Sequence, residues 1–166
     1  MNLQFIQVES LLTNAIYWNY DLYNTAEGKD NWNLENFSLL GPNRVPRHTD
    51  IVSRPYPMRS SAKPYLLFFD LETKLCAIIL KGPVVSEPTI VYVPYDMHYS
   101  SGFKVWASSK DATWDRNNQL LYWHSDRNQL SNQIIITSYH GLNTSVLPDA
   151  SKKLLDKTTI TFEFSS

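Results

Sequence analysis

The feature that most limits the fold of this chain is a series of short runs, rich in β-branched and aromatic residues, between Tyr65 and Phe164. Runs of this kind, about four to eight residues long and bounded by Gly, Pro, Asn or Asp, are typical of β-strands. The predicted strands are residues 65–69, 74–80, 89–94, 103–107, 112–116, 119–124, 132–138 and 158–164. Many short strands at close spacing predict a mainly β fold, an antiparallel two-sheet β-sandwich.

The chain before the sandwich has a different pattern, so we expect a boundary between residues 1–57 and residues 58–166. The predicted elements of the first part are a helix over residues 3–13, a strand over 15–20, a short helix or turn over 34–40, and a short helix that begins at His48 or Thr49 and ends before Arg54. Mixed apolar spacing favours the first helix, and Pro55 ends the last one.

Between Tyr17 and Leu40 the chain is rich in the residue types from which proteins build sugar sites. Tryptophan offers a flat apolar face to a sugar ring, and Asn, Asp and Glu offer hydrogen bonds to its hydroxyls. The predicted strand over residues 15–20 contains Trp18 and Asn19, and the loop after it carries Asp21 and Asn24. On residue types alone, a strand end whose aromatic side chains cap a core is the simpler explanation.

The spacing W-N-Y-D-x-x-N-T-x-x-G-x-x-x-W-N-x-E-N-x-S-L, which begins at Trp18, resembles the end of the catalytic barrel in glycoside hydrolase family five. The resemblance is to its endoglycoceramidase-like and steryl-glucosidase-like enzymes. Residues 51–57, Ile-Val-Ser-Arg-Pro-Tyr-Pro, are similar to the segment that leads into the C-terminal β-sandwich of that family. The resemblance implies that residues 1–57 are the last helix-strand-loop remnant of a (β/α)8 barrel plus a linker. Since a whole barrel takes about 250 residues, most of it would lie outside this chain.

The family resemblance implies a retaining β-glucosidase that acts on a glucosylated lipid, glucosylceramide or a steryl glucoside. Such an enzyme uses two carboxylates about 5–5.5 Å apart, and the family's two glutamates would lie upstream of this chain. We therefore assign no catalytic residue and expect the chain alone to be inactive. The alternatives are a non-catalytic β-sandwich module that binds carbohydrate or lipid through exposed aromatic side chains, and a purely structural domain.

The resemblance implies substrate-binding roles for four residues. Trp18 matches a platform that stacks under the sugar next to the cleaved bond. Asn19, Asp21 and Asn24 match loop positions near the pocket. Asn and Asp side chains also satisfy the backbone of their own loops, and this second role is left open for each of the three.

Four residues nearer the junction carry expectations of their own. We expect Glu9 to be a solvated helix residue. Pro55 and Pro57 favour an extended linker, which predicts that Tyr56 is buried in the seam between the two parts. The planar guanidinium of Arg54 predicts an acidic or carbonyl partner in the same seam. The alternative is a solvated tether. We also expect faster amide exchange before Pro57 than in the sandwich.

Composition excludes several classes of function. The formal net charge of −1 gives no electrostatic basis for binding nucleic acid. The chain has no apolar run of about 20 residues, and its first residues do not resemble a signal peptide. One cysteine, Cys76, permits no internal disulfide and fits a buried strand position. We therefore expect an intracellular, cytoplasmic protein with no metal and no cofactor, whose partners are a glucosylated lipid or carbohydrate and the missing part of a barrel.

Overall fold

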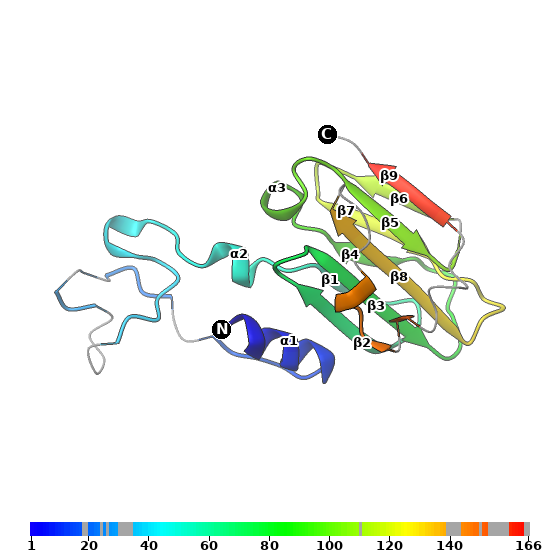
Figure 1. Ribbon diagram of the computed structural model, residues 1–166, viewed down its shortest axis with the longest axis horizontal. Coiled ribbons are helices and arrows are strands. Elements are labelled where there is room, and N and C mark those ends of the chain that lie inside the picture. Colours follow the sequence, from blue (N-terminus) through cyan, green and yellow to red (C-terminus); the bar gives the residue numbers. More distant parts are fainter. Residues whose placement is uncertain are drawn as a thin grey trace.

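The computed structural model describes residues 1–17, 20–23, 25, 27–29, 35–109, 111–138, 144–149, 151–152 and, for the backbone, 160–164. It shows a β-sandwich with one helix against its side and an arm that extends from one end (Figure 1). The arm is here the described part of residues 13–48.

The sandwich consists of two antiparallel sheets. Its strands are β1 (Tyr56–Arg59), β2 (Lys63–Asp70), β3 (Leu75–Lys81), β4 (Thr89–Tyr92), β5 (Phe103–Ala107), β6 (Asp111–Asp115), β7 (Leu120–His124), β8 (Ser131–Ser138) and β9 (Ile160–Phe164). One sheet has the order β1-β4-β7-β6 and the other the order β2-β3-β8-β5-β9. Every strand pairing is antiparallel. The mainly β, two-sheet sandwich expected from the sequence is confirmed.

The predicted strands are present with bounds close to those expected, but the sequence did not reveal β1. The residues read as an extended linker pair with β4, Tyr56 opposite Tyr92 and Pro57 opposite Val91. Proline is tolerated here because β1 is the edge strand of its sheet. On its open side no neighbouring strand needs the backbone N–H that proline lacks.

The main core lies between the two sheets. Its largest side chains without exposed area include Phe69, Phe103, Leu121, Trp123 and Ile134. Burial of one such side chain stabilises the fold by about 1.5–3 kcal/mol. Cys76 belongs to this core as a buried free thiol, as the sequence predicted, and burial raises the pKa of the thiol.

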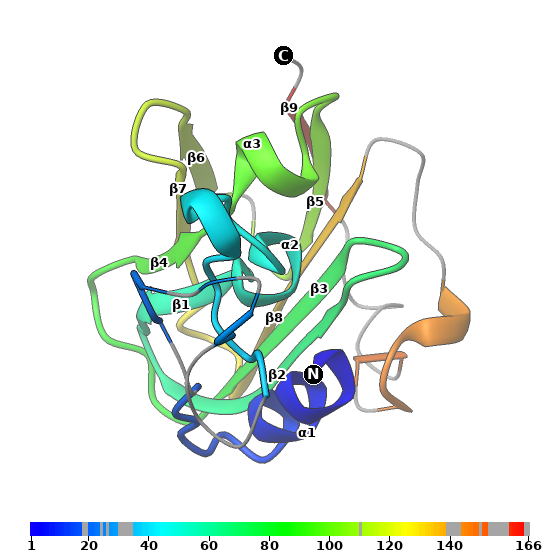
Figure 2. The same ribbon diagram turned by 90° about the vertical axis from the view of Figure 1, so that its left-hand side faces the viewer.

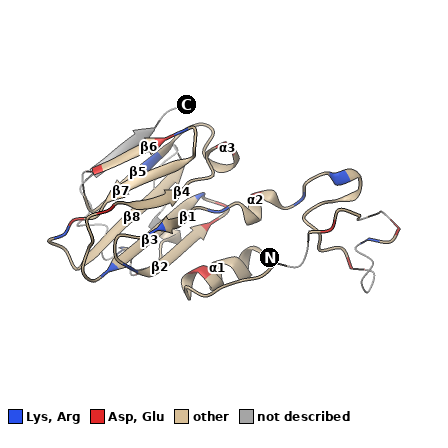
Figure 3. Cartoon of the chain, turned by 180° about the vertical axis from the view of Figure 1, so that it is seen from behind, with Lys and Arg blue, Asp and Glu red and all other residues tan. Residues whose placement is uncertain are grey.

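The two sheets differ in what covers their outer faces. Six of the seven residues of β3 are buried, because Leu75, Ala77 and their neighbour Ile135 also pack against Leu147 on the outer side. In β4 buried and half-buried residues alternate, the pattern of a sheet with one solvated face. Basic and acidic residues are interspersed on the chain rather than gathered on one face (Figure 3).

The described residues also form three α-helices, α1 (Asn2–Ser10), α2 (Thr49–Val52) and α3 (Tyr95–His98), and two 3-10 helices, η1 (Pro42–Arg44) and η2 (Thr144–Val146). The helices predicted over residues 3–13 and from His48 or Thr49 onward are present as α1 and α2. Helix α1 packs against β2 and ends at Ser10 (Figure 2). The sequence did not reveal α3, a single turn that follows Pro94.

Two predictions for the arm are wrong in the residues that the structure describes. Residues 15–17 and Tyr20 have no regular secondary structure, although a strand was expected there. A strand needs a neighbouring backbone to pair with, and no backbone hydrogen bond joins residues 15–17 to another described segment. Residues 35–40 form neither the short helix nor the hydrogen-bonded turn expected over residues 34–40, and an isolated bridge pairs Leu40 with Pro46 instead. The division into residues 1–57 and 58–166 stays a prediction.

Candidate functional site

The loop that carries the predicted sugar contacts is organised by Ser38, which has no exposed area. Its hydroxyl accepts hydrogen bonds from the backbone N–H groups of Asp21, at 3.0 Å, and Leu40, at 3.1 Å. The same oxygen lies 3.3 Å from the carbonyl oxygen of Asp21, to which it donates. One small side chain therefore joins both sides of the loop.

Arg47 closes the loop from the other side. Its guanidinium donates to the amide oxygen of Asn36 at 2.6 Å and to the carbonyl oxygen of Ser38 at 2.5 and 3.1 Å. The phenol of Tyr17 donates to the carbonyl oxygen of Phe37. Partial burial raises the pKa of Tyr17, and the charge of Arg47 opposes this shift. Hydrogen bonds therefore hold the described part of this loop together.

Three of the four predicted site residues, Trp18, Asn19 and Asn24, lie outside the described residues. Asp21 is described and half-buried, and its carboxylate accepts a hydrogen bond from the N–H of Tyr23 at 2.8 Å. This Asx-turn is the local role that was left open for Asp21. It occupies one carboxylate oxygen, Oδ1, in the loop itself.

Sequence reasoning did not identify Ser38 and Arg47 as the residues that hold this loop. Ser38 is part of the family-like spacing, so its place in the motif is a signal that could have been used. Arg47 lies beyond that spacing in a turn-rich segment, and no local pattern pairs it with Asn36.

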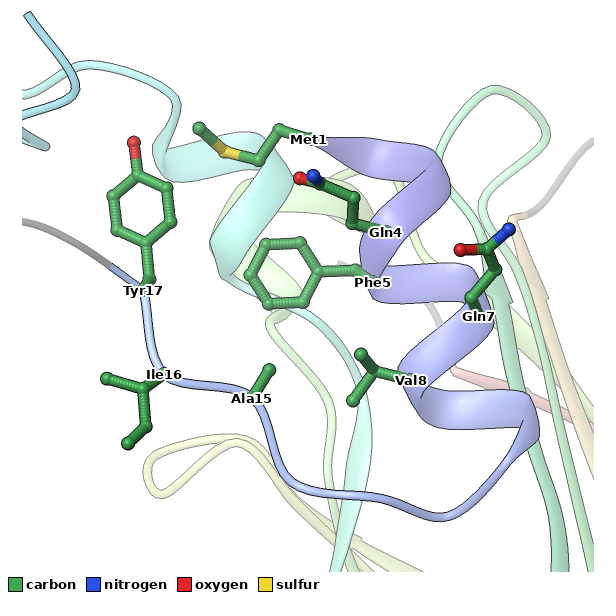
Figure 4. A pocket seen from close by; sticks show the side chains of 8 residues that line it. All are labelled: Met1, Gln4, Phe5, Gln7, Val8, Ala15, Ile16 and Tyr17. Atoms are coloured by element: carbon green, nitrogen blue, oxygen red, sulfur yellow. The ribbon is translucent and has the colours of Figure 1, made fainter.

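A pocket of about 330 Å³ lies between α1 and residues 15–17 (Figure 4). Its apolar lining comes from Met1, Phe5, Val8, Ala15, Ile16 and Tyr17, with two glutamines of α1 beside them. In Figure 4 the side chains of Phe5 and Val8 face Ala15, whereas Ile16 points away and is 97% exposed. The described residues that line this pocket include no carboxylate and no histidine.

Arg54 joins α1 to the sandwich. Its guanidinium donates to the carboxylate of Glu9, with one contact at 2.8 Å, to the carbonyl oxygen of Phe69 at 2.7 Å, and to Asn2 at 2.9 Å. It also lies close to two aromatic rings, 4.8 Å from the centre of Phe69 and 5.6 Å from that of Phe5. The predicted acidic or carbonyl partner of Arg54 is confirmed, since both kinds are present.

Glu9 is not solvated, so the prediction for it is wrong. Its side chain is only 10% exposed and pairs with Arg54, which is 5% exposed. Asn2, Phe5 and Glu9 share one face of α1, because side chains three or four positions apart line up on a helix. The partner of Glu9 lies 45 residues away in the sequence, so the local pattern of α1 could not predict that Glu9 is buried.

The prediction that Tyr56 is buried is also wrong. The ring is 46% exposed and lies 5.6 Å from the ring of Tyr92. Pairing of β1 with β4 sets Tyr56 opposite Tyr92, which is half-buried in the same sheet. The strand that the sequence did not reveal is the reason for this exposure.

The described residues contain no group of three or more His, Cys, Asp or Glu side chains placed to hold a metal ion. His98 donates from Nε2 to the carbonyl oxygen of Ser53 at 2.7 Å, and burial lowers the pKa of its imidazole. None of the described helices is long and apolar enough to cross a membrane.

Comparisons with known proteins agree on one group of enzymes. Residues 54–137 match the model of the glycoside hydrolase family 5 C-terminal domain. A glucosylceramidase of Rhizopus delemar is 25% identical over 147 residues, which cover 73% of this chain and 21% of that protein. Sterylglucosidase 1 of Cryptococcus neoformans has a TM-score of 0.72 at 18% identity, covering 86% of this chain and 24% of its own.

Endo-glycoceramidase II from Rhodococcus sp. has a TM-score of 0.62 at 16% identity, and the match covers 82% of this chain and 28% of its own. At these identities the structural likeness shows the fold. This chain spans less than a third of the length of each of these relatives.

Proposed function

Because the chain belongs to the glycoside hydrolase family 5 C-terminal domain family, as its sequence resemblance indicated, we propose that it is the C-terminal part of a retaining β-glucosidase of glucosylated lipids. The substrate class, glucosylceramide or a steryl glucoside, follows the names of the glucosylceramidase and sterylglucosidase that it resembles. One observation carries the proposal. The likeness to the sterylglucosidase covers 86% of this chain, so it extends beyond the family-matched residues 54–137.

In this proposal residues 1–57 are the end of a (β/α)8 barrel with its linker, whose last two residues also begin β1, and residues 58–166 are the rest of the sandwich. The unpaired backbone of residues 15–17 and the exposed side chain of Ile16 support it, because a barrel strand without its neighbours has both properties. The hydrogen bonds of Arg54 to Glu9 of α1 and to Phe69 of β2 support a fixed position of α1 on the sandwich.

Sugar binding is assigned in the proposal to Trp18 as a stacking platform and to Asn19, Asp21 and Asn24 as hydrogen-bonding residues. The support is the loop that Ser38 and Arg47 hold together at Asp21. A loop tied at both sides keeps its side chains in place at low entropic cost when a ligand binds.

The chain alone is expected to lack glycosidase activity. A retaining glycosidase needs two carboxylates about 5–5.5 Å apart, one as nucleophile and one as acid/base. Glu9 is the only glutamate before Glu27, and its carboxylate is bound by Arg54. It is therefore not placed to attack a sugar.

The test is a chimera in which this chain replaces the matched C-terminal part of the R. delemar glucosylceramidase. We expect the chimera to release glucose from glucosylceramide and the chain alone to release none. Trp18→Ala in the chimera should lower kcat/KM about tenfold or more, which corresponds to about 1.4 kcal/mol of lost transition-state binding. Tyr65→Ala, at an exposed aromatic residue of β2, is the matched control.

Two outcomes contradict the proposal. One is a chimera that melts cooperatively but releases no glucose. The other is glucose release from an aryl glucoside by the chain alone, unchanged in Trp18→Ala.

The second candidate is a non-catalytic module that binds carbohydrate or lipid, and the outer face of the four-stranded sheet favours it. Tyr56 and Tyr92 lie opposite each other there, and Leu120 is the next residue across the sheet. A glycan array and lipid vesicles, each probed with the chain and with Tyr56→Ala, test this candidate. Binding no higher than background leaves the purely structural role.

The proposed location is intracellular and cytoplasmic. The support is Cys76, a buried free thiol, which suits a reducing compartment. Localisation of a fluorescent fusion of the full-length protein checks this, and accumulation in secretory compartments contradicts it.

A further inference from the structure

A second pocket, of about 320 Å³, lies beside the C-terminal end of α3. It is formed by the turn between β2 and β3, the loop that follows α3, and the end of β8. The side chains that matter for its chemistry are those of Glu72, Lys74, Ser100, Ser101 and Ser138. This pocket is separate from the arm and from the pocket beside α1.

The walls of this pocket are held by buried tyrosines. Tyr99, 1% exposed, donates from its phenol to the carbonyl oxygen of Lys74 at 2.9 Å, which ties the loop after α3 to the β2–β3 turn. Tyr95 donates to the carbonyl oxygen of Ser100 at 3.2 Å. Gly102, with a φ of 97°, returns the chain to β5 in a conformation that favours glycine. Pockets that bind small molecules are usually preformed in this way.

The polar groups of the pocket differ in whether they already have partners. Thr73 is engaged, because its hydroxyl and its N–H both donate to the carboxylate of Asp70. In the described part of the chain, no hydrogen bond or ion pair is made by the side chains of Glu72, Lys74, Ser100, Ser101 and Ser138. The pocket therefore offers free donors and acceptors from three separate segments.

The chemistry of these groups distinguishes between ligands. His98 also lines the pocket, and burial lowers the pKa of its imidazole, which favours the neutral form at pH 7. The carboxylate of Glu72 and the ammonium of Lys74 then cancel in charge, so the pocket has no net attraction for a multiply charged anion such as phosphate. Each serine hydroxyl both donates and accepts. This combination matches the hydroxyls of a neutral sugar, which also donate and accept. The volume is at the low end for ligand pockets and fits one sugar ring better than a whole glycolipid.

We propose that the pocket between the β2–β3 turn and the loop after α3 binds one neutral sugar unit, with Glu72 and Lys74 as its charged contacts and Ser100, Ser101 and Ser138 as its hydroxyl contacts. The site is distinct from the residues proposed to bind the sugar in catalysis. It does not depend on the proposed glycosidase activity, because a sandwich that only binds glycans would use it equally.

The experiment is a titration of the ¹⁵N-labelled chain with methyl β-D-glucopyranoside, followed by amide chemical shifts. We expect saturable shifts at Ser100 to Gly102 and at Ser138, and no saturable shift with sodium phosphate. Ser101→Leu should abolish the shifts, and Ser86→Leu, an exposed serine outside the pocket, should leave them unchanged. Glu72→Ala should weaken binding about tenfold, the loss expected for a hydrogen bond to a charged group.

A free glycan and a glycolipid headgroup are two sources of the same sugar. A second arm therefore compares lipid nanodiscs with and without glucosylceramide. Tighter binding to glucosylceramide than to the free glucoside assigns the headgroup, and equal binding assigns a free glycan.

Three results overturn the proposal: no saturable shift with the glucoside, saturation by phosphate instead, or binding that is lost in Tyr56→Ala and kept in Ser101→Leu. Thermal melting of Ser101→Leu and Ser86→Leu shows whether both variants are folded. If Ser101→Leu does not fold, the affinity of Glu72→Ala for the glucoside, measured in the same titration, tests the proposal instead, because Glu72 is exposed. The chimera tests the catalytic proposal separately, because glucose release should be unchanged by Ser101→Leu.

Discussion

The sandwich closes around side chains such as Phe69, Trp123 and Ile134, none of which has exposed area, whereas the arm closes around the hydroxyl of Ser38 and the guanidinium of Arg47. Apolar burial has no direction and adds up over many contacts. Hydrogen bonds need particular atoms at particular distances, and each contributes only about 0.5–1.5 kcal/mol net. The difference implies that the sandwich is the stable unit and that the arm opens locally at much lower cost.

Helix α1 lies between these two regimes. Its contact with the sandwich combines the buried charge pair of Glu9 and Arg54 with the rings of Phe5 and Phe69, which both lie close to the guanidinium. The two segments before Pro57 should therefore differ in amide exchange. The amides of α1 should be protected together with those of the sandwich, whereas the amides of the arm should exchange fast.

The largest effect is expected from Trp123→Ala in the core. Removal of this ring should lower the free energy of unfolding by about 3–5 kcal/mol, because it leaves a cavity and removes the hydrogen bond that the indole N–H donates to the hydroxyl of Ser109. Urea unfolding followed by far-UV circular dichroism measures the loss. Tyr23→Ala, at an exposed ring of the arm, is the control and should cost less than about 0.5 kcal/mol. Similar losses in both variants would mean that the arm contributes to global stability.

The next effect concerns the junction at Arg54. Arg54→Met should cost about 3 kcal/mol, because it leaves the carboxylate of Glu9 buried without a partner. Adding Glu9→Gln to Arg54→Met should recover part of the loss, since the remaining buried group is then uncharged. A double-mutant cycle on the free energy of unfolding measures the coupling. Additive losses would show that the two side chains do not act as a pair.

A smaller, local effect is expected from Ser38→Ala. The change leaves the N–H groups of Asp21 and Leu40 without their partner, so the loop should lose about 1–3 kcal/mol of local stability. Hydrogen exchange at these two amides should become about five-fold faster or more, the rate change that about 1 kcal/mol produces. The urea midpoint should not change. A shift of the midpoint as large as that of Arg54→Met would show that arm and sandwich unfold together.

The smallest effect is pH dependence from His98. Burial lowers the pKa of its imidazole in the folded state, and the positive charge of Lys74 lowers it further. The hydrogen bond to the carbonyl oxygen of Ser53 and the nearby Asp50 raise the pKa and so oppose this shift. The unfolded state therefore binds the proton more tightly. The stability contribution is present above the unfolded pKa of about 6.5 and is lost as the pH falls through the lower folded value. Melting temperatures measured downward from pH 7 should fall less steeply in His98→Gln. Parallel slopes would exclude this role.

Local pattern was sufficient for most of the sandwich. The strands at residues 74–80 and 132–138 are marked by apolar runs, Leu-Cys-Ala-Ile-Ile-Leu in the first and Ile-Ile-Ile in the second, and turn residues lie near their ends, so the local pattern is enough to predict them. The same holds for α1 and for the buried position of Cys76. The family-like spacing from Trp18 onward located the loop around Asp21, although Trp18, Asn19 and Asn24 lie outside the described residues.

The tertiary structure decided what depends on partners far away in the sequence. Pro57 enters a strand because β4 lies beside it, and that pairing exposes Tyr56. Glu9 is buried because α1 meets Arg54, 45 residues further along the chain. The polar pocket exists because Tyr99, after α3, donates to the carbonyl oxygen of Lys74 in the turn between β2 and β3. Local propensity records the preferences of a residue and its neighbours, whereas the choice among distant surfaces is made only when the sheets and helices pack.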